Sequence, residues 1–250
     1  MKQASKKLLF SVIQAVVLFA VVVAVWYVAA ALVKSDLILP QPHEVLILTF
    51  QLLGKGSTYL ALLYTVLRAV IAFVVSLAFA VALTLLTGCY PKAKFSVGVV
   101  VSFLRALPTI AVILITLILF NSFITPVIVA FLVVFPVIFG VLNRTLNHNA
   151  KLLDLCKVYQ VKSAKKVKIV LFPLIAEELA TIVKENLPLC LKIVVAGEVL
   201  ALPLRGIGRE MYVGKVNLDT ASVVALTILT LVVCFVISGV VSLCERCKKC

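Results

Sequence analysis

Long apolar runs, separated by short polar segments, dominate the hydrophobic pattern of this chain. No charged residue lies between Leu8 and Val33 or between Ala106 and Asn143. A helix needs about 20 apolar residues to cross roughly 30 Å of hydrocarbon. Strands of a transmembrane barrel alternate apolar and polar residues instead, so the runs predict an all-α, polytopic helical membrane protein.

The pattern predicts six transmembrane helices, at residues 8–33, 58–90, 95–120, 125–142, 174–202 and 221–243. The charge-free stretch 106–143 would be about 57 Å long as one helix, so it must fold back on itself. Asn121, Ser122 and Pro126 mark the turn. We therefore divide the chain into residues 1–57, a first span with an external loop, and residues 58–250, a five-helix core with a cytoplasmic loop at 144–173.

Basic residues are unequally distributed between the predicted loops. With six spans, fifteen Lys and Arg residues lie on the side that holds both termini, and the other side has only Lys34, Lys55, Arg205, Arg209 and Lys215. The positive-inside rule places the richer side in the cytoplasm. The net charge of +14 is then explained by membrane orientation, and no nucleic acid partner is expected.

Charged residues inside the predicted spans are concentrated in the fifth, which contains Glu177, Glu178, Lys184, Glu185, Lys192 and Glu198. A charge at mid-bilayer costs at least about 2.5–3.5 kcal/mol, so such residues face protein or water. Glu178, Glu185 and Lys192 are seven residues apart, which places them within about 40° on one helical face. Internal ion pairing and a translocation pathway both account for this face. The pathway residues would be Arg105, Lys184, Glu185, Lys192 and Glu198, and Pro188 would kink the span.

A lysine-rich segment from Asp154 to Pro173 separates two of the apolar runs. It resembles the permease subunits of ATP-binding cassette (ABC) importers, whose motif is Glu-Ala-Ala, three residues, Gly, nine residues and Ile-x-Leu-Pro. The matching positions here are Asp154-Leu155-Cys156, Gln160, Val170 and Phe172-Pro173. The spacing fits, while Gln160 replaces the glycine between two short helices.

Further marks resemble the branch that imports nitrate, sulfonates, taurine, bicarbonate and thiamine-precursor pyrimidines. In chain order they are Leu39-Pro40-x-Pro42, Thr65-Val-Leu-Arg68-Ala, Leu104-Arg105-Ala-Leu-Pro108, Phe135-Pro136, Ala196-Gly197-Glu198 and Gly206-Ile-Gly208. The resemblance implies the MetI-like fold of type I importer permeases, located in the bacterial plasma (inner) membrane with both termini in the cytoplasm. The chain departs from the family pattern at residues 121–126, which lack the Phe-Gly-x-Gly sequence that is frequent in the family.

The resemblance also implies the partners of the chain. These are a second permease chain, expected to be identical, a cytoplasmic ABC ATPase dimer and an extracytoplasmic solute-binding protein. The segment 144–173 would be the coupling loop that docks on the ATPase, with Asp154 near a helix start. Its contact residues would be Asp154, Leu155, Cys156, Tyr159, Gln160, Val161 and Pro173. Arg205, Gly206 and Gly208 would gate the pore outside or contact the binding protein, although an ordinary turn explains the two glycines equally well.

Two other function classes compete with a permease subunit. An ion-gradient-driven secondary transporter would use Glu185 and Glu198 as proton carriers, but the inverted repeats typical of that class are not evident. A membrane-embedded enzyme would need a catalytic cluster, and none is recognised. The chain has no phosphate-binding loop for ATP hydrolysis and no zinc-type motif, so no cofactor or metal is expected. Cys244, Cys247 and Cys250 have no assigned role.

Overall fold

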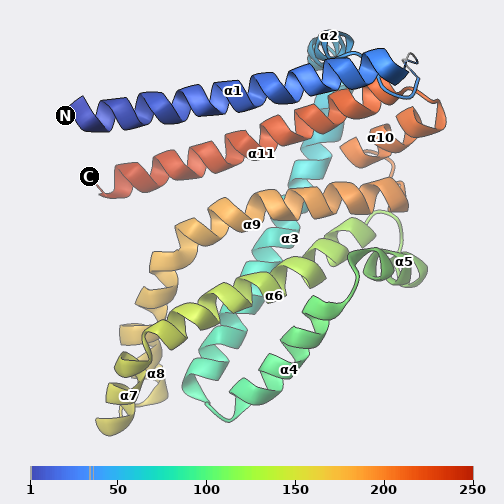
Figure 1. Cartoon of the computed structure of the whole chain (residues 1–250). Coiled ribbons are helices and arrows are strands. Elements are labelled where there is room, and N and C mark those ends of the chain that lie inside the picture. Colours follow the sequence, from blue (N-terminus) through green and yellow to red (C-terminus); the bar gives the residue numbers. More distant parts are fainter. Residues whose placement is uncertain (1, 34, 36, 250) are drawn as a thin grey trace. The chain divides into compact units, whose positions relative to one another are not determined.

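The computed structural model describes the backbone of residues 2–33, 35 and 37–249, and the side chains of residues 10, 13, 14, 16–33, 35 and 37–243. Every regular element in these residues is helical (Figure 1), which confirms the all-α prediction. Within the same residues, four helices are long and apolar enough to cross a membrane. They are α1 (Lys2–Val33), α3 (Gly56–Cys89), α6 (Thr125–His148) and α11 (Thr220–Lys249).

A fifth candidate span consists of two helices, α4 (Ala93–Ala106) and α5 (Thr109–Leu119), which are bent by 95° relative to each other. The predicted third span, at 95–120, is therefore broken into two helices. Leu107 and Pro108 both have extended backbone, with ψ of 130° and 126°. Proline disfavours helical conformation in the preceding residue and has no N–H for the helical ladder, and both effects favour a break at this position.

The predicted fifth span is helix α9 (Phe172–Ala201). It is long enough to cross a bilayer, but its six charged residues interrupt the apolar sequence, and it is not among the candidate spans. Pro188 lies inside α9, which continues as helix on both sides. The described residues thus contain four candidate spans, or five with the bent pair, and the predicted number of six is not reached.

Contacts divide the chain into two compact units. The first contains residues 1–56 and 211–229 and includes a helix that the sequence pattern did not predict, α2 (Pro42–Leu53). Pro42 stands in its first turn, where the missing N–H of proline costs nothing. The indole nitrogen of Trp26 donates a hydrogen bond to the carbonyl of Pro40 at 3.2 Å, which attaches the connection after α1 to that helix.

The second unit contains residues 57–210 and 230–250, and α6 lies at the centre of its core. This helix packs against α4, α5 and α9 (Figure 1). Gly197 of α9 approaches it so closely that an added Cβ would lie 3.0 Å from the Cα of Pro126. Helix α3 contributes small buried residues at helical spacing, Ala69, Ala72, Ser76 and Ala80, which let helices approach without a strong hydrophobic driving force. The turn predicted around Asn121 is confirmed, because α6 begins at Thr125.

Candidate functional site

A buried polar cluster lies at the end of α9, centred on the carboxylate of Glu198, which is fully buried. Arg68 of α3 donates to it at 2.6 Å, the Thr65 hydroxyl lies 2.8 Å from it, and the backbone N–H of Gly208 donates at 3.0 Å. We call Thr65, Arg68, Glu198 and the loop 205–208 the Glu198 cluster. A buried carboxylate is tolerated only when it is paired and hydrogen-bonded, and here both conditions are met.

The loop after α9 is held onto this carboxylate by backbone contacts. Leu202 ends α9 in a left-handed conformation with φ of 51°, which turns the chain back. Arg68 also donates to the carbonyl of Arg205 at 2.7 Å, and the N–H of Ile207 donates to Thr65 Oγ1 at 2.9 Å. Helix α10 (Ile207–Val216), which the sequence pattern also did not predict, begins at this point.

Both glycines of the loop are required by close approach to Glu198. A Cβ at Gly206 would lie 2.6 Å from the carboxylate carbon, and one at Gly208 would lie 2.6 Å from the Cβ of Glu198. Real side chains cannot occupy that space, so the loop can dock only with glycine at these positions.

The Arg68 guanidinium is enclosed by aromatic rings as well as by Glu198. Its central carbon lies 5.0 Å from the ring centre of Phe123 and 6.0 Å from that of Tyr64, distances typical of cation–π contacts. The guanidinium of Arg205 also lies over the Tyr64 ring, with its central carbon 5.8 Å from the ring centre. The Nε of Arg68 is buried and has no hydrogen-bond partner.

The Glu198 cluster brings together residues that were predicted to have separate roles. Glu198 was assigned to the translocation pathway, whereas Arg205, Gly206 and Gly208 were assigned to an outer gate or a contact with the binding protein. Thr65 and Arg68 were not predicted as site residues at all. The available signal was the cost of a lone charge in an apolar helix, since Arg68 in such a run requires a polar or acidic partner elsewhere in the fold.

The other residues predicted for the pathway are exposed. Lys184, Glu185 and Lys192 lie on the uncovered side of α9, and Glu178 is half-buried. Among the described residues the ion pairs are Arg68–Glu198 and Lys157–Asp154, so Glu185 forms no internal pair. We call Lys184, Glu185 and Lys192 the charged face of α9.

Arg105 lies apart from these residues, exposed in the last turn of α4. Its guanidinium lies against Gly140 of α6, where any added Cβ would collide with it.

The predicted coupling loop consists of short helices, α7 (Ala150–Val158) and α8 (Ser163–Lys166), and a π-helical turn, η1 (Val167–Leu171), which leads into α9. Gln160 follows α7 with φ of 51°. The N–H of Val161 donates to the carbonyl of Cys156, and that of Gln160 to the carbonyl of Lys157, at 2.9 and 3.1 Å. These two bonds define a Schellman C-cap, whose left-handed residue is usually glycine.

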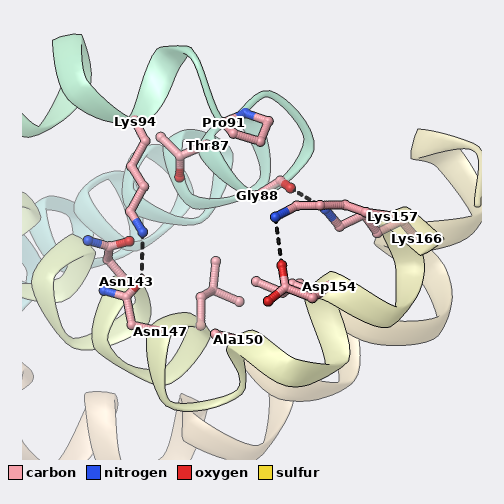
Figure 2. Close-up of a pocket in the computed structure, with 12 residues that line it drawn as sticks. Thr87, Gly88, Pro91, Lys94, Asn143, Asn147, Ala150, Asp154, Lys157 and Lys166 are labelled. Atoms are coloured by element: carbon pink, nitrogen blue, oxygen red, sulfur yellow. Dashed lines mark hydrogen bonds and ion pairs between the residues drawn. The ribbon is translucent and has the colours of Figure 1, made fainter. Parts of the chain in front are cut away.

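The residues predicted to contact the ATPase are mostly solvent-accessible. Leu155, Tyr159, Gln160 and Pro173 are exposed, and Cys156 and Val161 are half-buried. Tyr159 has 77% of its surface exposed and lies next to the exposed side chain of Val158. Asp154 does not lie at a helix start as expected, because α7 begins at Ala150, and its carboxylate instead pairs with Lys157 at 2.7 Å (Figure 2).

No group of three or more potential metal ligands occurs in the part of the chain that the structure describes. The thiols of Cys244, Cys247 and Cys250 lie outside the described side chains.

No protein-family model matches this chain, and a search of curated proteins finds no significant match.

Proposed function

We propose that this chain is the membrane-spanning permease subunit of an ABC importer. In this proposal α9 and the bent α4–α5 pair each count as one span, which gives six spans with both termini in the cytoplasm of a bacterial inner membrane. Two copies form the pore, a cytoplasmic ATPase dimer drives it, and a solute-binding protein on the outer side delivers a small solute, such as an anion or a heterocycle.

The observation that carries the proposal is the segment between α6 and α9. This segment consists of two short helices and a sharp turn at Gln160, and it connects two long helices. The side chains of Leu155, Val158 and Tyr159 on it are exposed. Exposed apolar side chains on a short helix, beside a basic and otherwise polar surface, are typical of a protein-docking surface. A helix whose two ends continue into long helices can transmit the movement of a docked ATPase to α6 and α9.

The charged face of α9 supports a transport role. Exposed Lys184, Glu185 and Lys192 cannot face hydrocarbon at low cost. If α9 crosses the bilayer, this face requires water, a solute or a second chain, and all three are present in a pore formed by two copies.

The secondary transporter is less well supported. Glu198, one of its two proton carriers, accepts hydrogen bonds from three donors, Thr65, Arg68 and Gly208, and it fixes a loop. A proton carrier must exchange its proton with water during each cycle, whereas this carboxylate is fully buried.

The test is purification of the tagged chain from native membranes in mild detergent, followed by mass spectrometry of associated proteins. We expect an ABC ATPase to co-purify with the parent chain and to be lost from a Val158→Asp, Tyr159→Ala variant. Leu204→Asp is the matched control, because Leu204 is also an exposed apolar residue but follows the opposite end of α9. Recovery of a monodisperse chain without any ATPase would contradict the proposal and favour a secondary transporter.

A further inference from the structure

A small pocket lies between the ends of α3 and α6 and the short helices α7 and α8 (Figure 2). Its volume is about 140 Å³. A single water needs about 10–15 Å³, so the pocket can hold a polyatomic group. All of its lining residues belong to the second unit, so its shape depends on one compact body.

The pocket is lined by more basic than acidic side chains. Lys94, Lys157 and Lys166 line it together with one carboxylate, Asp154. Lys94 donates to the amide oxygen of Asn147 at 2.6 Å, and Lys157 donates to Asp154 at 2.7 Å. Each ammonium carries three N–H donors, so these bonds leave donors for a further acceptor. The excess of positive charge favours an anion.

Lys166 gives the strongest reason to expect a ligand. It is only 7% exposed, and its ammonium donates to the carbonyl of Gly88 at 2.6 Å, which caps the end of α3. That partner is neutral. A buried ammonium is strongly destabilised unless a negative charge compensates it, as Glu198 does for Arg68. The acid that lines the same pocket, Asp154, is paired with Lys157.

Helix dipoles do not remove this positive charge. The C-terminus of α3 is followed directly by the N-terminus of α4, and that of α6 by the N-terminus of α7. Each such junction joins a partial negative end to a partial positive end, and the two largely cancel. The side-chain charges therefore decide which ligand the pocket favours.

We propose that this pocket binds a phosphate group, held by Lys94, Lys157 and Lys166. The pocket lies at the ends of two candidate spans, which is the depth of lipid headgroups, and basic pockets between spans bind anionic headgroups. The phosphate can belong to an anionic phospholipid or be free in solution. The proposal does not depend on the importer function.

The test measures lipid retention by the full-length chain in nanodiscs, with native mass spectrometry as the readout. We compare discs that contain anionic phosphatidylglycerol with discs of phosphatidylcholine alone. A lipid phosphate ligand predicts selective retention of phosphatidylglycerol, weakened about thirtyfold in a Lys94→Gln, Lys157→Gln variant, because each lysine that pairs directly with the bound phosphate contributes about fivefold, whereas lysines outside the pocket do not contact it. The control is Lys165→Gln, Lys168→Gln, two exposed lysines of the same segment outside the pocket.

A second arm tests free phosphate in the phosphatidylcholine discs. Millimolar inorganic phosphate, but not chloride of equal ionic strength, should protect Lys94 and Lys157 from amine-reactive labelling without protecting Lys165. If the double variant is not monodisperse, Lys94→Gln alone is used, with a fivefold effect expected. The proposal is overturned if neither arm shows an effect, or if the control variant loses lipid as the pocket variant does.

Discussion

At the scale of single residues, Glu198 and Arg68 form a charge pair that connects α9, α3 and the loop after α9. Both side chains are almost completely buried, so removing one partner leaves an uncompensated charge in the core. Such a loss costs about 3–5 kcal/mol, whereas replacing both partners by apolar residues of similar size costs much less.

We therefore predict strong coupling in a double-mutant cycle. Glu198→Met and Arg68→Met should each lower the free energy of unfolding by about 3–5 kcal/mol, and the double variant should lose much less than their sum. Equilibrium unfolding in mixed micelles measures these values. Glu185→Met, at an exposed position of the same helix, serves as control and should change stability by less than about 0.5 kcal/mol. Additive losses would show that the pair is not energetically coupled.

Gln160 provides a second residue-scale prediction. A non-glycine residue in the left-handed region costs roughly 1–2 kcal/mol, so Gln160→Gly should raise the melting temperature and Gln160→Val should lower it. Thermal unfolding of the purified protein measures both. Tyr159→Gly is the comparison, since Tyr159 has φ of −83° and gains nothing from glycine. Stabilisation by Tyr159→Gly but not by Gln160→Gly would contradict the assigned turn.

At the scale of elements, docking of the loop 205–208 depends on the absence of side chains at its glycines. Gly208→Ala should detach the loop from α9, because an added Cβ would lie 2.8 Å from the backbone nitrogen of Val199 and 2.6 Å from the Cβ of Glu198. Gly98→Ala is the matched control, because Gly98 lies inside α4 and an added Cβ there meets nothing within 4 Å.

We expect Gly208→Ala to increase backbone amide exchange at residues 205–208, measured by hydrogen–deuterium exchange with mass spectrometry. Gly98→Ala should leave exchange there unchanged and should stabilise α4 by about 0.5–1 kcal/mol. Equal exchange in the two variants would mean that the glycine contact does not hold the loop.

The elements that could be predicted from sequence are those that the hydrophobic pattern determines. The apolar runs give α1, α3, α6 and α11 because about 20 apolar residues leave few alternatives to a membrane helix. The break at Leu107–Pro108 was missed because the charge-free run passed through the proline without interruption. Helices α2 and α10 were missed because each is too short for a hydrophobic run to identify it.

The sites were predicted less completely than the elements, for a physical reason. Charged residues in apolar helices could be identified individually, but the partner of each depends on how the helices pack. Arg68 and Glu198 are 130 positions apart in the chain, and only the packing of α3 against α9 brings them together. The turn at Gln160 is adopted although glutamine disfavours it, since the Schellman hydrogen bonds compensate.

At the scale of the whole molecule, α9 connects the segment proposed to dock on the ATPase with the Glu198 cluster at its other end, and the charged face lies between them. An ABC importer requires ATP binding to alter the exposure of residues that line its pore. To measure this exposure, a cysteine is introduced at one position of the charged face in each of three variants, Lys184→Cys, Glu185→Cys and Lys192→Cys. Val232→Cys and Phe235→Cys place single thiols at exposed apolar positions of α11, where lipid is expected.

The most direct test of the account is the reactivity of these thiols toward a membrane-impermeant maleimide in native membranes, with and without ATP and vanadate, against the unsubstituted chain as background. We expect the thiols on the charged face of α9 to react and their rates to change on trapping with ATP and vanadate, while those on α11 stay unreactive in both states. Rates on α9 that do not respond to ATP and vanadate, or α9 thiols as unreactive as those of α11, would contradict the account.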